Sequence, residues 1–271
     1  MTCRGSGAAG TGPGGGSRFC SPDNDDSSDV NQMRSRRARQ HGVALVEVAL
    51  FSLIAAALVT AVIRGQELVE SARVRAVILQ QENARSAYFA FQDRFRALPG
   101  DYAYATANIR GVTVNGNGNA LIEPNGAPLG ASGTPYEAIL AWDHMSKAGF
   151  LGNYEFDLND RSRSNPFNIY GGYLDIGYDN TYGDPGVPGR PLRHTLKTGH
   201  NIPASVLAEV DRKIDDGNGL TGTFQFSNHA WCASCQQPSG PGQPGQCVDA
   251  AGTWAATTAT TSRNCGAASF L

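Results

Sequence analysis

The sequence predicts an α+β protein, with a long N-terminal helix packed on a small antiparallel-sheet head and a loop-rich, disulfide-pinned C-terminus. Three observations predict this class. An apolar run at 43–63 continues without proline into an amphipathic stretch at 64–97. In the remaining residues, 98–271, loops rich in glycine, asparagine and proline separate short segments, and four cysteines gather near the end. One helix and one sheet-based layer around a common core satisfy these signals most simply.

The apolar run is long enough to cross a membrane. It has 21 residues, from Val43 to Ile63, and Glu47 is its only charged side chain. At 1.5 Å per residue such a helix is about 31 Å long, close to the thickness of a hydrocarbon core. An ionisable group in such a span costs roughly 2.5 to 3.5 kcal/mol at the centre, so Glu47 calls for a functional explanation.

The segment Gly42-Val43-Ala44-Leu45-Val46-Glu47-Val48, preceded by a basic stretch, resembles the prepilin leader of type IV pilins and type II secretion pseudopilins. The resemblance implies that a membrane peptidase cuts after Gly42 and that the new amino terminus, Val43, is methylated. It also implies that Glu47 pairs with the N-terminal ammonium of a neighbouring subunit. Pairing on assembly would recover part of the cost of an isolated charge in lipid.

Residues 1–42 are then a leader peptide. Residues 1–32 are rich in glycine, serine and aspartate, without apolar periodicity, and are typical of disorder. Translation from Met33 would give a ten-residue leader, and both starts give the same mature chain. A signal anchor or a Sec signal peptide is the competing interpretation, because Val59-Thr60-Ala61 resembles a small-residue cleavage site.

Charge bias predicts the orientation. Arg34, Arg36, Arg37 and Arg39 lie before the span, and a sparser set of arginines follows it. The denser positive flank stays in the cytoplasm, so we expect a single-pass protein of the bacterial inner membrane with a periplasmic head. By resemblance, the protein then moves into a pilus or pseudopilus filament.

The amphipathic half of the helix is expected to pack under the head. Its apolar residues recur at steps near three and four, as one buried face requires: Val69, Ala72, Ala76, Leu79, Ala87, Ala90 and Phe91. The helix should run from near Val43 to Ala97, because Leu98-Pro99-Gly100 is an ordinary terminator.

Three segments of the head resemble a large-headed, minor-pilin-like branch of the same family. Leu98-Pro99-Gly100-Asp101 follows the first helix, residues 141–151 resemble the branch's second helix with Gly149 as its cap, and residues 211–217 match a late segment. Short strands are expected at 172–178 and 223–227. Loops are expected at 111–133, 159–171 and 179–191.

The mature part of the chain holds four cysteines: Cys232, Cys235, Cys247 and Cys265. An even number in an exported domain predicts two disulfides, with three possible connectivities. The spacing of Cys232 and Cys235 also fits zinc ligands or a thioredoxin-like redox motif, but the chain lacks a second pair of that spacing.

No cofactor is expected, with calcium as the one candidate, because the resemblance implies that pseudopilin heads can bind it in late loops. Oxygen-rich turns carry Asp179 and Asp184 in one loop and Asp215 and Asp216 in another. Neither loop has EF-hand spacing, and solvated turns are the preferred interpretation.

Several function classes lack a motif in this sequence. The five histidines show no metal-binding spacing, and the chain has neither a nucleophile elbow nor a phosphate-binding glycine loop, so we expect no enzyme. Without the first 42 residues, which hold six arginines and four aspartates, the net charge is −4, and no basic stripe suits nucleic acid. The partners that the resemblance implies are other pilin subunits, the prepilin peptidase and methyltransferase, an inner-membrane assembly platform, and lipid before assembly.

Overall fold

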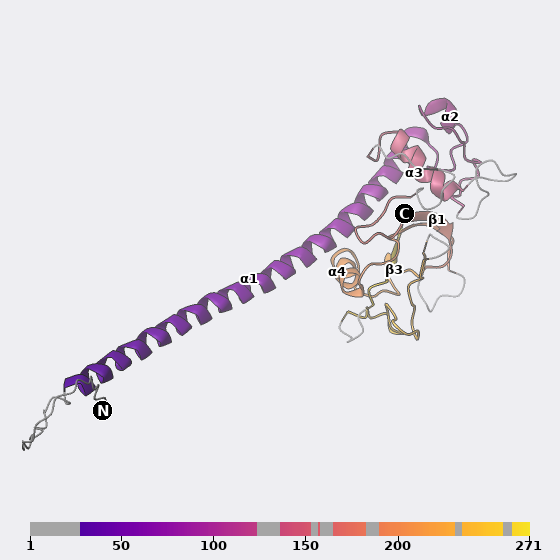
Figure 1. Ribbon diagram of the computed structural model, residues 1–271. Coiled ribbons are helices and arrows are strands. Elements are labelled where there is room, and N and C mark those ends of the chain that lie inside the picture. Colours follow the sequence, from indigo (N-terminus) through magenta and orange to yellow (C-terminus); the bar gives the residue numbers. More distant parts are fainter. Residues whose placement is uncertain are drawn as a thin grey trace, which may run out of the picture. The chain divides into compact units, whose positions relative to one another are not determined.

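The computed structural model describes residues 28–123, 136–152, 157, 165–182, 190–230, 235–256 and 262–271, with side chains from residue 45 onward. The chain divides into two compact units, Met1–Ile63 and Arg64–Leu271. Helix α1, Ser28–Phe95, contributes to both units (Figure 1). The α+β class is confirmed, because the second unit holds a four-stranded antiparallel sheet beside this helix.

Helix α1 begins earlier than expected. We expected it to start near Val43, whereas it starts at Ser28 and includes the arginine-rich segment. That segment contains no proline, and arginine and glutamine have high helix propensity, so nothing in it stops a helix. At its other end α1 stops at Phe95, two residues before the expected Ala97, and Arg96 follows with a positive φ of 51°.

In the second unit, α1 buries a different stripe from the one expected. Val69 and Leu79 are more than half exposed. The buried positions instead alternate in steps of three and four along one seam: Val74, Val77, Gln81, Ala84, Tyr88 and Phe91. Both stripes have helical spacing, so the period alone could not choose between them. Of the expected set, Ala87 and Phe91 are buried.

The sheet has the strand order β1-β2-β4-β3, all antiparallel: β1 Asp175–Asp179, β2 Arg193–Lys197, β3 Phe224–Phe226 and β4 Ala267–Phe270. β1 pairs with β2 so that Asp175 lies opposite Lys197. The predicted strands at 172–178 and 223–227 correspond to β1 and β3. β2 and β4 were not predicted, because Arg-His-Thr-Leu-Lys and Ala-Ala-Ser-Phe show little strand patterning.

The described residues of the second unit hold three further helices: α2 Ala105–Asn108, α3 Glu137–Lys147 and α4 Ala204–Ile214. α3 starts four residues before the expected 141. It ends at Lys147, and Gly149 caps it as expected, with a φ of +82° and an N–H that donates to the carbonyl of Ser146. The Phe150 N–H donates to the Met145 carbonyl, which completes a Schellman cap. α4 was not predicted as a helix.

The head has two apolar clusters. The first joins α1 to α3 and to the sheet through Phe91, Trp142, Ile176 and Leu196, among others. The second joins α1 to α4 and to the C-terminal segment through Val74, Leu207, Phe224 and Trp254, among others. In Figure 1, α3 lies beside β1 and α4 beside β3, so each cluster covers a different edge of the sheet.

Candidate functional site

The residues of the expected processing and assembly site lie on α1 in the first unit. Gly42 and Val43 are within the helix, and their side chains lie outside the described residues. The side chain of Glu47 is exposed, and among the described side chains none forms a hydrogen bond or an ion pair with it. Its neighbours Leu45 and Leu50 are also exposed, at 73% and 59%. Glu47 is therefore a lone carboxylate on an uncovered apolar surface.

This surface meets the requirements of a membrane span. One 18-residue window of α1 has a mean hydropathy of 2.4, and none of that window is buried within the protein. The hydroxyls of Ser52 and Thr60 donate to the carbonyls of Ala49 and Ala56, both at 2.8 Å. Such bonds satisfy polar side chains within the helix, as hydrocarbon surroundings require. α1 is thus long enough and apolar enough to cross a membrane once.

The C-terminal cysteines include one disulfide with both partners described. Cys247 and Cys265 are bonded across 18 positions, with their Cα atoms 5.7 Å apart, and both are fully buried. Cys235 is also disulfide-bonded, which excludes it as a zinc ligand in this structure, and Cys232 lies outside the described residues. The bridge holds a segment that contributes Val248 and Trp254 to the second core cluster.

The four acidic calcium candidates do not form one group. Asp184 lies outside the described residues. Asp179 lies 3.1 Å from the Nζ of Lys197 and belongs to an ion-pair network. Asp215 and Asp216 are joined by Asp211, with one carboxylate oxygen of each within 4.8 Å of the others. The sequence analysis named Asp215 and Asp216 as candidates but missed Asp211. The available signal was spacing, because residues four apart on a helix lie on the same face.

Most oxygens of this acidic cluster already hold the chain. Asp215 Oδ2 accepts the N–H groups of Thr223 and Phe224, the latter at 2.7 Å. Asp216 accepts hydrogen bonds from the Asn218 N–H and the Thr221 hydroxyl. The Trp254 indole N–H donates to Asp211 at 2.6 Å. Burial, together with the charges of Asp216 and Asp215, raises the pKa of Asp211 to about 6. These hydrogen bonds give the cluster a structural role, and the interpretation of the two loops as solvated turns stays a prediction.

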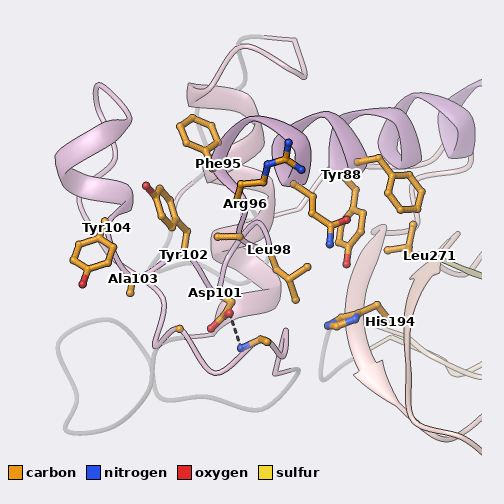
Figure 2. A pocket seen from close by; sticks show the side chains of 15 residues that line it. Tyr88, Phe95, Arg96, Leu98, Asp101, Tyr102, Ala103, Tyr104, His194 and Leu271 are labelled. Atoms are coloured by element: carbon orange, nitrogen blue, oxygen red, sulfur yellow. Dashed lines mark hydrogen bonds between the residues drawn. The ribbon is translucent and has the colours of Figure 1, made fainter.

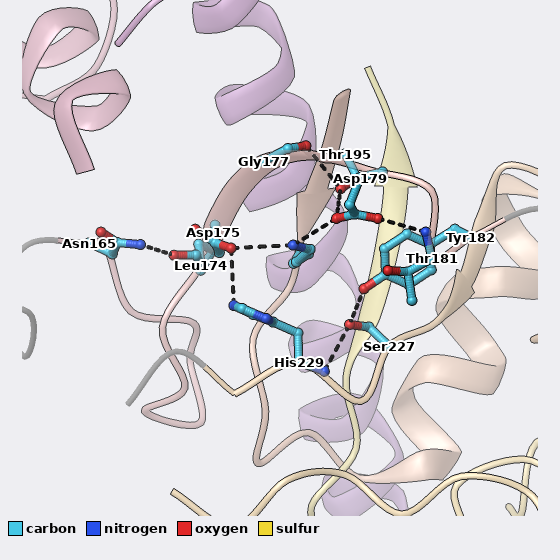
Figure 3. Close-up of polar contacts among 11 residues, drawn as sticks. Asn165, Leu174, Asp175, Gly177, Asp179, Thr181, Tyr182, Thr195, Ser227 and His229 are labelled. Atoms are coloured by element: carbon cyan, nitrogen blue, oxygen red, sulfur yellow. Dashed lines mark hydrogen bonds and ion pairs between the residues drawn. The ribbon is translucent and has the colours of Figure 1, made fainter. Parts of the chain in front are cut away.

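A second charged group is buried inside the sheet (Figure 3). Lys197 on β2 is 4% exposed and lies 3.4 Å from Asp175, which is fully buried, and His229 Nε2 lies 3.0 Å from the same carboxylate oxygen. Burial raises the pKa of Asp175, but the charge of Lys197 and the contact with His229 outweigh it and hold the pKa below its usual value. Burial by itself would lower the pKa of Lys197. The negative charges of its aspartate neighbours outweigh this effect, so the pKa of Lys197 is raised. The network is therefore a compensated ion pair.

Two more buried carboxylates fix the loop after α2. The oxygens of Asp101 accept the N–H groups of Asn119 and Ala120 at 2.9 and 2.8 Å. Glu137, at the start of α3, accepts the N–H groups of Asn117 and Glu123. Burial raises the pKa of Glu137 to about 7, although its backbone hydrogen bonds act against this shift. These acids bind backbone and are therefore supports of the loop.

His144, on α3, is a packing residue. Its side chain is fully buried, with Nδ1 accepting the Gly100 N–H at 3.1 Å and Nε2 lying 3.0 Å from the Val114 carbonyl. Burial lowers the pKa of His144 to about 4, so the ring is neutral at physiological pH. Both ring nitrogens are occupied, which leaves none for acid–base chemistry.

No protein-family model matches the chain, and neither a curated protein nor a solved structure matches it.

Proposed function

We propose that this protein is a structural subunit, a minor pilin or pseudopilin, of a type IV pilus or a type II secretion pseudopilus. It is cut after Gly42, stored in the inner membrane by its apolar helix, and then assembled into a helical filament. The observation that carries the proposal is Glu47, an exposed carboxylate on a largely apolar helix surface with no other charged residue from Leu45 to Ile63.

Glu47 needs a partner that the described chain does not provide. A free amino terminus at Val43, four residues earlier, would provide a positive charge on each copy of the cut chain. If copies bundle through their apolar helices, the ammonium of one can neutralise the carboxylate of the next. A buried polar pair of this kind fixes register between helices. An apolar surface alone would give association without register.

The head supports placement outside the cytoplasm. Its disulfide between Cys247 and Cys265 suits an oxidising compartment, and the arginine-rich flank favours a cytoplasmic N-terminus. The exposed apolar residues of α1 in the second unit, Leu68, Val69 and Leu79, add surface for contact with neighbouring subunits.

A signal-anchored or Sec-secreted periplasmic binding protein is the alternative. It would account for the apolar helix but gives Glu47 no role. The Val59–Ala61 segment, where a Sec enzyme would cut, lies inside α1, and the Thr60 side chain bonds back within that helix.

N-terminal mass spectrometry of the native protein separates these functions. We expect a chain that begins at Val43 with a methylated amine. An uncut N-terminus would instead indicate a signal anchor, and a chain that begins at Val62 would indicate Sec secretion. Either of these two results would overturn the proposal.

A further inference from the structure

One cavity of the head is lined by aromatic rings (Figure 2). It has a volume of about 730 Å³ and lies between the last turns of α1, the segment 101–104 and β2. All of its walls belong to the second unit. Its size is in the range of small-molecule sites, which are concave, mostly apolar and fitted with a few polar groups.

Three rings lie in a row along this pocket and form an aromatic strip, in which Tyr102 is tilted by 39° against Phe95 and edge-on to Tyr104 at 73°. The centroids of Phe95 and Tyr102 are 5.5 Å apart, and those of Tyr102 and Tyr104 are 6.4 Å apart. Tyr104 is 69% exposed, so its ring faces water. A water-facing aromatic surface beside a cavity marks a binding site.

The rings of the strip do not form an aromatic cage. Recognition of a quaternary ammonium needs rings that surround the cation, each within about 6 Å of it. Here the rings touch one another, so no space remains between Phe95 and Tyr102 for a cation. The guanidinium of Arg96 at the same pocket would also repel one. Because the rings are inclined to one another, the strip offers separate ring faces to a ligand and no single flat surface.

Polar groups with free hydrogen-bonding capacity complete the lining. Tyr88 is 3% exposed, and its hydroxyl makes no hydrogen bond within the described residues. Tyr102 accepts a hydrogen bond from Asn108 at 2.6 Å and can still donate its own proton. His194 Nε2 accepts the Ile122 N–H at 3.2 Å, so the proton of the neutral ring is on Nδ1 and can be donated.

Charge at the pocket is balanced. Asp101 is occupied by the backbone N–H groups of Asn119 and Ala120. Arg96 lies 4.0 Å from Asp93, in a pair that is more than 80% exposed. Burial lowers the pKa of His194, so it stays neutral at physiological pH. Such a lining favours a neutral ligand over an anion or a cation.

We propose that this pocket binds a neutral saccharide. Pyranose rings have C–H groups on their faces, which pack against the negative faces of aromatic rings, and hydroxyls around their edges, which pair with polar groups. The Phe95–Tyr102–Tyr104 strip provides aromatic faces for a sugar ring, with Tyr104 the exposed one, and Tyr88, His194 and Arg96 provide the hydrogen bonds. The cavity has room for more than one sugar ring. A filament subunit with this site would contact glycans directly.

Saturation-transfer NMR on the full chain in detergent micelles tests the site. The probes are neutral oligosaccharides, namely cellotriose, maltotriose, chitotriose and N-acetyllactosamine, with sialyllactose as the charged comparison. We expect at least one neutral probe to bind with a Kd of about 1 mM or tighter and sialyllactose to bind more weakly. Absence of binding for every neutral probe at 10-fold higher concentration, or a preference for sialyllactose, would overturn the proposal.

Two variants locate the binding without unfolding the head. Tyr104→Ala removes an exposed ring and should weaken binding about tenfold, the effect of losing one stacking partner. Arg96→Gly removes the guanidinium while relieving the positive φ of 51°, so the melting temperature should hold or rise while binding weakens about threefold.

Phe167→Ala is the matched control, because Phe167 is an exposed ring, at 52%, that does not line the pocket. It should leave the Kd unchanged. Equal losses in Tyr104→Ala and Phe167→Ala would show unspecific contact with exposed rings and overturn the site. These measurements use unassembled protein, so their outcome is independent of whether the chain forms filaments.

Discussion

Glu47 on α1 and Asp175 on β1 are both carboxylates among apolar side chains, and the chain treats them in opposite ways. Asp175 is fully buried and is compensated inside the head by Lys197 and His229. Glu47 is exposed on an apolar helix, and no described side chain compensates it. A fold can thus provide the counter-charge itself, or it can leave that task to another molecule.

The difference follows from the number of neighbours. A sheet with helices on its edges surrounds Asp175, so several elements can place groups around it. A single helix surface has nothing above it, and residues on the same helix at positions 43–63 are all uncharged apart from Glu47. A charge there is satisfied only by assembly or by water, which is why Glu47 carries our proposal for function.

Removing Glu47 should have the largest effect. Glu47→Ala is expected to leave membrane insertion intact, because it makes the span more apolar, and to reduce incorporation into filaments about 100-fold or more. Loss of one partner of a buried ion pair costs about 3–5 kcal/mol. Immunoblots of the membrane fraction and of sheared filaments measure both quantities.

Glu67→Ala is the control for this experiment, since Glu67 forms an exposed pair with Arg64 at 3.0 Å. It should assemble normally. Normal incorporation of Glu47→Ala would refute the role of the intermolecular ion pair.

Removing the internal counter-charge should affect the head instead. Lys197→Met leaves Asp175 buried without its strongest partner, so the free energy of unfolding should fall by about 3–5 kcal/mol. Thermal denaturation followed by circular dichroism measures this. Lys213→Met, which removes a half-exposed pair with Glu209, should cost less than about 1 kcal/mol. Similar losses in the two variants would mean that the buried network is not compensated as described.

Glu137 should have a smaller effect on the stability of the head, and this effect should depend on pH. Its pKa is raised to about 7, so the folded head binds this proton more tightly than the unfolded chain does. The stability due to Glu137 is therefore greatest below about pH 4.5 and is lost as the pH rises toward 7. Asp175, whose pKa is lowered, acts with the opposite sign and only in more acidic solution.

The test compares melting curves of the wild-type protein and Glu137→Gln at pH 5 and pH 8. Asp211 shifts in the same direction as Glu137 and His144 in the opposite one, so only the difference between the two proteins isolates Glu137. We expect the wild type to lose about 1–2 kcal/mol more than the variant over this range. Parallel pH profiles would contradict the raised pKa.

Calcium should have the smallest effect. Because Asp215 and Asp216 already accept hydrogen bonds that hold their turn, we expect about 5 mM calcium to shift the melting temperature by less than about 1 °C. Differential scanning fluorimetry with EDTA-treated protein gives the reference. A saturable rise of several degrees that Asp216→Asn abolishes would show that the cluster is a calcium site.

Part of this structure could be predicted because its signals are local. The apolar run and Glu47 are read directly from neighbouring residues, and Gly149 caps α3 as its sequence suggested. β2 and β4 could not be predicted, since Arg-His-Thr-Leu-Lys and Ala-Ala-Ser-Phe become strands only through pairing with each other and with β1 and β3. The buried stripe of α1 was misplaced for the same reason, because the head selects one of two stripes with equal spacing.

By itself, the sequence determined that an uninterrupted apolar helix carries one acid and that cysteines gather in the C-terminal segment, since composition and spacing along the chain specify these features. Only the tertiary structure decided which side chains from distant parts of the chain come into contact. It placed Lys197 against Asp175, added Asp211 to Asp215 and Asp216, and formed an aromatic pocket from α1, the segment after it and β2. Contacts between distant residues depend on long-range packing, and no local pattern encodes them.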